Sequence, residues 1–512
     1  MTKGRFSKVI VAFSVFLAMI LLFNSFSIIR PNKVLAETTI KSITVYSWED
    51  YIDFGYEDVS EASDVLLEKY PGEERAKLQS SIIDLFEEET GIKVNYYSFA
   101  TNEEMYNELL KNPNSVDLIC PSEYMIMKMK DEDLIKPYSM PQNYVEYGAE
   151  YIKNVFDDLG LSTPDGKTYA IGYMWGTMGL IYDATSGKFT DEDFASWSSL
   201  FDQRVKGRVT IKDSLRDSYI LAIALAYKDE LLDLKQQYKL EEISENEYNS
   251  KLFSIFNRTD NETIDKVRQQ LVSLKGNLYG FEVDAGKNDL LTGKIDVNFA
   301  WSGDAVYSMR EGDDLGKEIR YVVPEEGSNV WFDGWVMTKN ANEDLAVKFL
   351  DYLSRPSTAI RNMEYIGYTS CIAGDEVFEY VQKNFDDGGE KEVDLSYFFG
   401  EGEEYKIYAS DTEDGYYRHL VAQYADKETI LRCAVMDNFS VKDLELINEM
   451  WNEVKLITLS KTMLIIVGVL IVLGIVAFVL FKFKDKIFKD KLDKTHKEKQ
   501  SKYKVVSKKE IR

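Results

Sequence analysis

A chain of 512 residues, with 45% hydrophobic and 13% aromatic residues, has the length for two or three compact units and too many aromatic side chains to be disordered. Its formal net charge of −26 argues against nucleic acid as a partner, because binding a polyphosphate needs a basic protein face. The three cysteines (Cys120, Cys371 and Cys433) are sparse and odd in number, which argues against a disulfide framework and against a thiolate metal site.

The chain has two histidines, and His496 lies in a basic segment at the carboxyl end. A histidine-based zinc site or a Ser-His-Asp triad would therefore depend on His419 alone. A phosphate-binding loop of the Gly-x-x-x-x-Gly-Lys-Ser/Thr type does not occur. We expect no catalytic residues, no metal site and no cofactor.

Charge is distributed unevenly along the chain. Residues 1–36 carry a net charge of +5 and residues 482–512 one of +8, which leaves −39 for residues 37–481. An acidic field raises the local concentration of cationic solutes. The alternative is that this charge serves only solubility.

Residues 1–36 are typical of a secretory signal, with early basic residues, an apolar run and the cleavage motif Val34-Leu35-Ala36; an uncleaved anchor is the alternative. Residues 462–481 are uncharged and, as a helix, would span about 30 Å, the thickness of a bilayer core. A buried core helix would also fit this pattern. The basic residues 482–512 that follow would be cytoplasmic by the positive-inside rule, and could touch anionic lipid. We therefore expect a transmembrane tether, with the acidic part of the chain outside.

The first exported unit alternates strand-like and helix-like patterns. Strands are expected at 42–47, 92–99 and 116–120, with helices at 73–90 and 102–112. This order indicates a parallel, doubly wound sheet, which binds ligands beyond the carboxyl ends of its strands. Aromatic and acidic residues follow two of these ends: Trp48, Glu49, Asp50 and Tyr51 after the first, and Ser122, Glu123 and Tyr124 after the third.

A second α/β unit begins near residue 169. It carries expected strands at 207–211 and 297–301, a helix at 214–227, and a charged helical insertion at 228–262. A strand at 330–336 would return to the first unit, followed by helices at 343–354 and 357–365 and a mainly helical segment at 373–455. A chain that leaves one lobe, builds another and returns forms a hinged clamp. We expect lobe 1 at 37–170, lobe 2 at 171–330, the return at 331–370, and a helical part of lobe 2 or of the hinge at 371–455.

Carboxylates and tryptophans at strand ends suit a linear polyamine, a methylene chain with two to four ammonium groups. A desolvated cation–π contact contributes about 2 kcal/mol, and a charge-assisted hydrogen bond to carboxylate about 1.5–3 kcal/mol. Three or four such contacts, less the cost of ordering the ligand, give about −8 kcal/mol, which is micromolar affinity.

Ten short motifs in residues 42–370 give the exported region its resemblance to the spermidine/putrescine-binding proteins of ABC importers, which are extracellular solute-binding proteins. They are YSWEDY (46–51), EETGIKVNYY (88–97), SFATNEEMYNEL (98–109), DLICPSEY (117–124), YMWG (173–176), SWSSL (196–200), DSLRD (213–217), AWSGD (300–304), VWFD (330–333) and IGY (366–368). The resemblance implies an α/β, two-lobe fold like that of periplasmic binding proteins, with hinge strands between the lobes. It also implies a polyamine ligand, and as partners an ABC permease and its ATPase subunits.

The resemblance also implies roles for the matched residues. Trp48 and Tyr51 would line the first lobe, and Ser122 and Tyr124 would follow the other strand end. Trp301 and Trp331 would sandwich the methylene chain, with Tyr368 closing the wall. Asp333 and Asp217 would each hold an ammonium group. Two positions leave alternatives open: Glu49 could add a cation site or point to solvent, and either Asp213 or Ser214 could match an acidic position of the family. The segments at 53–80 and 228–262 contain more residues than the corresponding segments usually do in the family.

We weigh three functions. An importer's receptor closes on its ligand and docks on a permease. A membrane-anchored ectoenzyme would use paired carboxylates for hydrolysis. A sensor or adhesin would signal through the short tail. The receptor agrees best with the missing catalytic motifs, although another small cationic amine could be its ligand.

Overall fold

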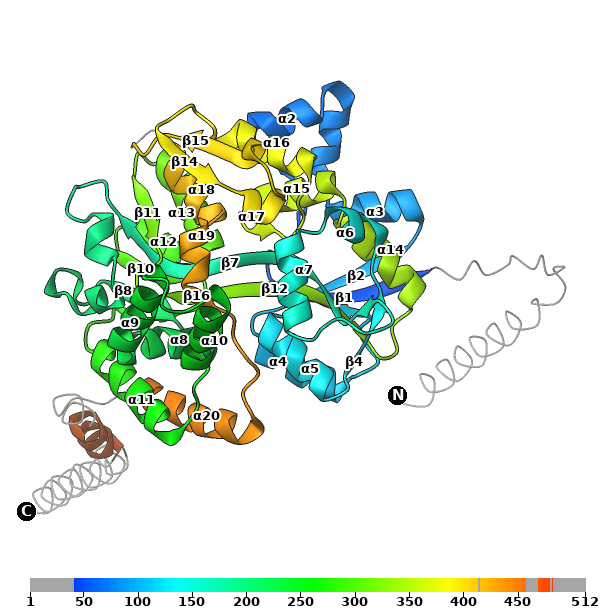
Figure 1. Cartoon of the computed structure of the whole chain (residues 1–512). Helices are drawn as coiled ribbons and strands as arrows, with labels where there is room; N and C mark the ends of the chain where they lie inside the picture. Colours follow the sequence, from blue (N-terminus) through cyan, green and yellow to red (C-terminus); the bar gives the residue numbers. More distant parts are fainter. Residues whose placement is uncertain (1–40, 413–414, 457–467, 479–480, 482–512) are drawn as a thin grey trace, which may run out of the picture. The chain divides into compact units, whose positions relative to one another are not determined.

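The computed structural model of the chain describes residues 41–412, 415–456, 468–478 and 481 (Figure 1). It divides into two compact units, Met1–Ser440 and Val441–Arg512. The expected signal at 1–36 and the expected basic tail at 482–512 lie outside the described residues.

Two long antiparallel strands, β7 (Ala170–Asp183) and β12 (Ser328–Thr338), join the two halves of the first unit (Figure 1). The main sheet runs in the order β2 (Lys93–Phe99), β1 (Ser42–Trp48), β3 (Leu118–Ile119), β12, β7, β10 (Val297–Trp301), β8 (Val209–Lys212) and β9 (Gly280–Glu282). One end of β12 pairs with β3, whereas one end of β7 pairs with β10. The expected two-lobe α/β fold with hinge strands is therefore confirmed, including the return of the 330–336 strand to the first half.

The three strands predicted for the first half are parallel, since β2 and β3 both pair in parallel with β1, whereas β12 pairs antiparallel with β3. One prediction is wrong, because residues 73–90 do not form a single helix. A 3-10 helix ends at Gln79, and Ser81 then caps a separate α-helix by accepting a hydrogen bond from the backbone N–H of Asp84. The elements of this half are β1 (Ser42–Trp48), η1 (Val59–Glu61), α2 (Asp64–Lys69), η2 (Gly72–Gln79), α3 (Ile82–Thr90), β2 (Lys93–Phe99), α4 (Asn102–Lys111), β3 (Leu118–Ile119), α5 (Glu123–Asp131), β4 (Ile135–Lys136), β5 (Tyr138–Ser139), α6 (Gln142–Tyr147), α7 (Glu150–Asp158) and β6 (Lys167–Thr168).

Segment 53–80 is held to the first half by a buried ion pair. Asp53 is fully buried and lies 2.5 Å from a guanidinium nitrogen of Arg361, which also donates hydrogen bonds to the backbone carbonyls of Lys77 and Ser80. Breaking such a pair by removing one partner costs about 3–5 kcal/mol. The insertion is thus an integral part of this half.

In the second half, β10 and β9 pair in parallel with β8, and helices pack against β8 and β10. Its core includes Ile181, Leu290 and Met309. The predicted helices of the 228–262 insertion are confirmed as α9 and α10. The elements are η3 (Asp191–Phe194), η4 (Trp197–Phe201), η5 (Gln203–Val205), β8 (Val209–Lys212), α8 (Leu215–Ala226), α9 (Lys228–Lys239), α10 (Glu245–Phe256), α11 (Asn261–Lys275), β9 (Gly280–Glu282), α12 (Gly286–Leu291), β10 (Val297–Trp301), α13 (Ser302–Asp314) and β11 (Ile319–Val322).

The remaining segment of the first unit contacts both halves: α16 packs on α15 and α2, and α18 packs on α13. It is less helical than predicted, because β14 and β15 form a two-stranded antiparallel sheet and β16 pairs with β12. Its elements and those that lead to it are α14 (Glu343–Leu353), α15 (Pro356–Ile366), β13 (Thr369–Ser370), α16 (Asp375–Phe385), β14 (Lys391–Asp394), α17 (Ser396–Phe399), η6 (Glu403–Tyr405), β15 (Lys406–Ala409), α18 (Tyr417–Gln423), α19 (Lys427–Leu431) and β16 (Cys433–Ala434).

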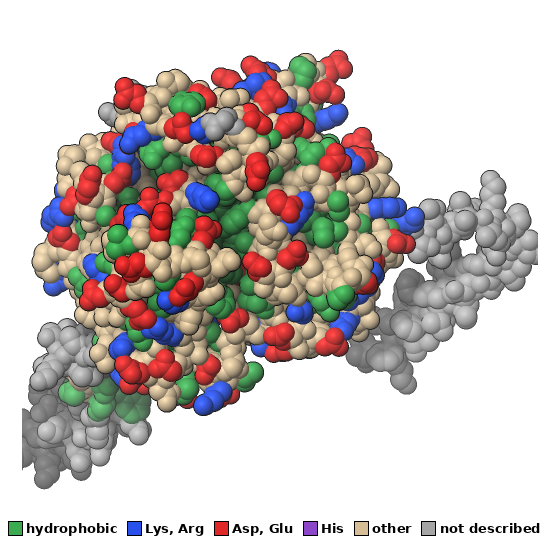
Figure 2. Space-filling view, viewed as in Figure 1, with side chains coloured by type: hydrophobic (Ala, Val, Ile, Leu, Met, Phe, Trp, Pro, Cys, Tyr) green, Lys and Arg blue, Asp and Glu red, His purple; other side chains and the backbone are tan. Residues whose placement is uncertain are grey.

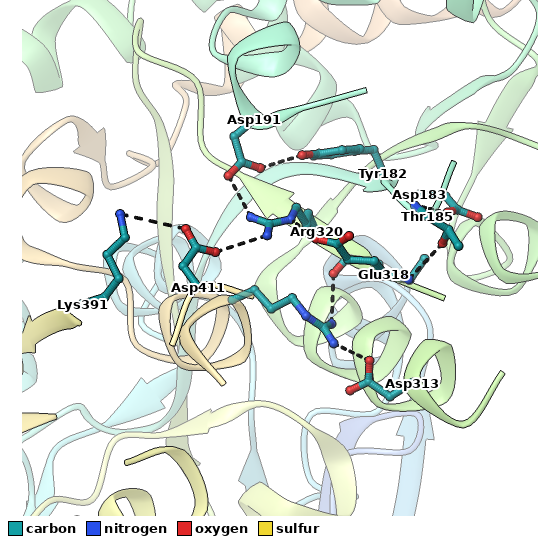
Figure 3. Close-up of polar contacts among 11 residues, drawn as sticks. Tyr182, Asp183, Thr185, Asp191, Asp313, Glu318, Arg320, Lys391 and Asp411 are labelled. Atoms are coloured by element: carbon teal, nitrogen blue, oxygen red, sulfur yellow. Dashed lines mark hydrogen bonds and ion pairs between the residues drawn. The ribbon is translucent and has the colours of Figure 1, made fainter. Parts of the chain in front are cut away.

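Arg320 attaches this segment to the second half (Figure 3). Its guanidinium lies 3.2 Å from a carboxylate oxygen of Asp191 and 3.2 Å from one of Asp411, and Asp411 in turn lies 3.9 Å from the ammonium of Lys391. A network of this kind is stronger than an isolated surface pair, because several charges share one rigid cation.

In the second unit the structure describes α20 (Val441–Lys455) and a helix over residues 468–478. None of the helices within the described ranges is both long and apolar enough to cross a bilayer. The span expected at 462–481 lies partly outside those ranges.

On the face shown in Figure 2, acidic side chains are spread among basic ones over both halves of the first unit, as the strongly acidic middle of the chain leads one to expect. Hydrophobic side chains gather in a hollow near the middle of this face.

Candidate ligand-binding site

The carboxylate of Asp333 lies at the centre of the candidate site. Tyr51 donates a hydrogen bond of 2.7 Å to its Oδ2, and Ser122 donates one of 2.7 Å to its Oδ1. Asp333 is 6% exposed. Among the residues that the structure describes, no lysine or arginine forms an ion pair with it, so both of its partners are neutral hydroxyl groups.

Local backbone features bring these three side chains together. The register of β12 against β7 shifts between Asp333 and Gly334, and such a bulge redirects a side chain. After β1 the chain turns at Asp50, whose positive φ of 49° is tolerated by aspartate, and this turn places Tyr51 inward. Ser122 follows β3 and forms an isolated bridge with Asp333. The two predicted strand ends therefore converge on one carboxylate.

Burial raises the pKa of Asp333 to about 7; hydrogen bonds from Tyr51 and Ser122 lower it, and the charge of Asp217 raises it further. Burial likewise raises the pKa of Asp217 to about 6 and that of Glu123 to about 8. All three buried carboxyl groups are thus costly to ionise, but the charge of Arg216 lowers the pKa of Asp217 and of Glu123, whereas no basic side chain among the described residues contributes to the pKa of Asp333. A bound cation would remove that cost.

An aromatic wall adjoins Asp333. The ring of Tyr368 lies 5.5 Å from that of Tyr51 and 5.6 Å from that of Trp331, centroid to centroid. Trp331 is 7% exposed and its indole N–H donates to the carbonyl of Thr177 at 3.4 Å. Such faces attract cations and also pack against methylene groups.

Two motif glycines make room for this wall. A Cβ at Gly176 would lie 2.7 Å from the ring of Trp331, and one at Gly303 would lie 2.4 Å from the ring of Tyr368. Only glycine allows backbone and ring to approach so closely. The glycine of YMWG is therefore explained by Ser302 and Trp331, which it faces, and the glycine of AWSGD by Tyr368.

A second cluster surrounds Trp301. The ammonium of Lys212 lies 4.1 Å above the Trp301 ring centroid, 2.9 Å from Asp304 Oδ2 and 3.2 Å from Glu282 Oε1. Burial lowers the pKa of Lys212, but the two carboxylates more than offset this and leave it raised, so the lysine is charged. Tyr368 donates to the other oxygen of Asp304 at 3.2 Å, which links this cluster to the wall.

A third cluster lies where the halves meet. The guanidinium of Arg216 in α8 lies 4.9 Å above the ring of Tyr124 in α5 and 3.5 Å above that of Phe439. Asp217 follows in the first turn of the same helix, where its backbone N–H donates to the cap residue Ser214. Arg216 therefore links the second half to the first.

The structure places the predicted residues in different surroundings. It brings together five of them around one carboxylate: Tyr51, Ser122, Trp331, Asp333 and Tyr368. Trp301, Tyr124 and Asp217 lie in the two adjoining clusters. Trp48 packs on Phe99 at 4.7 Å, Glu49 is exposed, and the backbone N–H of Asp213 donates to the carbonyl of Glu282.

Sequence reasoning missed Lys212, Arg216 and Glu282 as members of these clusters. Glu123 was noticed only as a residue that follows a strand, and Asp304 as the last residue of the AWSGD motif. The available signal for Lys212 was its position at the end of a short, mostly apolar strand, where it follows Val209–Ile211. A lysine that is buried there requires carboxylate partners.

Comparison with known proteins agrees with this fold. Over 81% of the chain, the structure superposes on 99% of a solved Listeria monocytogenes chain assigned to a spermidine/putrescine ABC transporter, with a TM-score of 0.53 and 25% sequence identity. It also covers 98% of the spermidine/putrescine ABC transporter substrate-binding protein PotD from Streptococcus pneumoniae, with a TM-score of 0.50 over 81% of this chain and 24% identity.

The chain belongs to the bacterial extracellular solute-binding protein family, whose model matches residues 81–375. Among curated relatives, the spermidine/putrescine-binding periplasmic protein of Escherichia coli K12 is 27% identical over 293 residues, which are 56% of this chain and 72% of that protein. The putrescine-binding periplasmic protein PotF of the same organism is 23% identical over 344 residues, 65% of this chain and 78% of that protein. The resemblance to spermidine/putrescine-binding proteins is confirmed.

Proposed function

We propose that this chain is the polyamine-binding component of an ABC importer and that it captures its ligand outside the cytoplasm. The observation that carries the proposal is the state of Asp333, a buried carboxylate whose partners are two neutral hydroxyls, beside a wall of Trp331 and Tyr368. An ammonium group would supply the missing counter-charge, and the rings would cover its methylene chain.

Family membership supports the remainder of this proposal. The relatives named above are spermidine/putrescine- and putrescine-binding proteins. Closure of the two halves around β7 and β12 would present the bound form to a permease that ATPase subunits drive. In this proposal the site binds the ligand and does not catalyse a reaction. Another small cationic amine is the second candidate ligand, because the same carboxylates and rings would hold it.

Calorimetry of the detergent-purified full chain tests the ligand class. We expect putrescine or spermidine to bind with roughly micromolar affinity. The matched control is 1,4-butanediol, which has the carbon chain of putrescine without its charges and should not bind. Equal heats for diol and diamine, or no heat with either polyamine, would contradict the proposal.

We further propose that residues 462–481 tether the binding unit to the membrane, with residues 482–512 in the cytoplasm. The support is the uncharged sequence, the basic residues after it, and the exposure of apolar side chains in the described part of that segment, among them Leu470, Leu473 and Phe478. Apolar side chains in this number require an apolar environment.

Truncation tests the tether. Removing residues 456–512 should move the protein from the membrane fraction to the soluble fraction while polyamine binding is retained. The control is a variant in which only residues 482–512 are replaced. It keeps the apolar segment and should stay in the membrane fraction. A truncated protein that stayed with membranes would instead favour an uncleaved anchor within residues 1–36.

A further inference from the structure

A lysine of the chain itself already occupies a complete cation-binding position beside the candidate site. The ammonium of Lys212 donates to the backbone carbonyl of Val283 at 2.9 Å, contacts Asp304 and Glu282 at 2.9 and 3.2 Å, and lies on the face of Trp301. The Lys212 side chain is 1% exposed. Two carboxylates, one carbonyl and one indole face are the partners that an alkylammonium ligand would require.

A single carboxylate, that of Asp304, connects this position to the aromatic wall. Asp304 accepts from Lys212 through Oδ2 and from Tyr368 through Oδ1, so the same carboxylate serves the lysine and the wall. The ring of Tyr368 then contacts Tyr51, which donates to Asp333. A continuous row of contacts therefore leads from the Lys212 ammonium to Asp333.

The two ends of this row differ in their counter-ions. The negative charges of Asp304 and Glu282 are balanced by the ammonium of Lys212, whereas, within the described residues, the carboxylate of Asp333 accepts hydrogen bonds from hydroxyl groups only. A ligand ammonium is thus needed at Asp333, while at Trp301 the chain provides its own. The lysine side chain has four methylenes and an ammonium, so it is at least as long as an aminopropyl arm, which has three methylenes and an ammonium.

We infer that Lys212 occupies one cation subsite of the candidate site with its own ammonium, so that the site selects a diamine over a triamine. The inference rests on the proposed function, since it concerns which polyamine that site takes. Lys212 acts here as a specificity-determining residue.

The test is the Lys212→Ala variant of the full chain, titrated calorimetrically with putrescine and with spermidine. The wild type should bind putrescine at least as tightly as spermidine. In the variant, Asp304, Glu282 and the face of Trp301 become available to a third ammonium, and the affinity for spermidine relative to putrescine should rise at least tenfold.

Lys287→Ala is the matched control. Lys287 lies 3.7 Å from Asp304 but interacts with the ring of Tyr307 rather than that of Trp301. Its removal deletes the same charge near the same carboxylate, and the spermidine-to-putrescine ratio should change less than threefold. An equal change in both variants would assign the effect to charge alone and overturn the inference.

Removing Lys212 leaves two buried carboxylates without their shared cation, so the variant could fail to fold. The charge-balanced pair Lys212→Ala with Glu282→Gln keeps the inference testable, with folding checked by thermal unfolding. A folded variant whose ratio stays within threefold of wild type would overturn it. A wild type that binds neither amine would overturn the proposed function as well, which separates the two failures.

Discussion

The Asp333→Asn variant should bind polyamine more than tenfold more weakly than the wild type. Asparagine keeps the shape of the side chain and one carbonyl acceptor for Tyr51 or Ser122, but it removes the charge that a ligand ammonium needs. A charge-assisted hydrogen bond contributes about 1.5–3 kcal/mol, which corresponds to roughly 10- to 150-fold in affinity. Calorimetry measures this loss. Affinity within threefold of wild type would show that Asp333 does not hold the ligand.

The same residue makes the binding depend on pH. With a pKa of about 7 in the unliganded protein, Asp333 becomes protonated as the pH falls below 7, and an ammonium ligand must then displace a proton. Wild-type affinity should fall about tenfold from pH 8 to pH 6. The Asn variant should lose most of this dependence and retain only the contribution of Asp217, whose pKa is about 6.

The free energy of unfolding of the unliganded protein should fall as the pH rises, whereas the affinity for polyamine should rise. Because the folded-state pKa of Asp333 is raised above its ordinary value, its contribution to stability is present in acid and is lost as the pH rises through 7. At pH 8 the unliganded Asn variant should therefore unfold at a higher temperature than the unliganded wild type. At one polyamine concentration, the Tm of the wild type should rise more than that of the variant, because the variant binds the ligand more weakly.

The Trp331→Ala variant should lose about thirtyfold in affinity for spermidine. The ring forms part of the wall with Tyr368, and a desolvated cation–π contact contributes about 2 kcal/mol. Removing a buried tryptophan also lowers the free energy of unfolding by about 3–5 kcal/mol.

Trp175→Ala separates these two effects. Trp175 is also buried, lies on β7 and stacks on Phe398 at 5.5 Å, so its removal should cost similar stability. Its affinity for spermidine should remain close to wild type. Equal losses of affinity in the two variants would show that Trp331 acts only through folding and does not contact the ligand.

Local pattern was sufficient to predict the strands and helices that carry the site. Alternating and amphipathic runs located β1, β2, α4 and β10, and the polar residues after β1 and β3 follow from the rule for parallel sheets. The helix expected at 73–90 failed because its amphipathic pattern continues through Ser80 and Ser81, whereas the Ser81 side chain competes for the backbone and begins a new helix.

The arrangement of the site depends on contacts between distant residues, which no local pattern contains. Asp333 meets Tyr51 across 282 positions and Ser122 across 211, and only the family resemblance predicted that Asp333 belongs with them. Lys212 was not predicted for the same reason. It can be buried because it forms ion pairs with Glu282 and Asp304, which come 70 and 92 positions later.

A crystal structure of the chain with putrescine tests the central claim most directly. We predict one ammonium group within hydrogen-bonding distance of the Asp333 carboxylate, with the methylene chain against Trp331 and Tyr368. A ligand bound elsewhere, with Asp333 still held only by Tyr51 and Ser122, would contradict it.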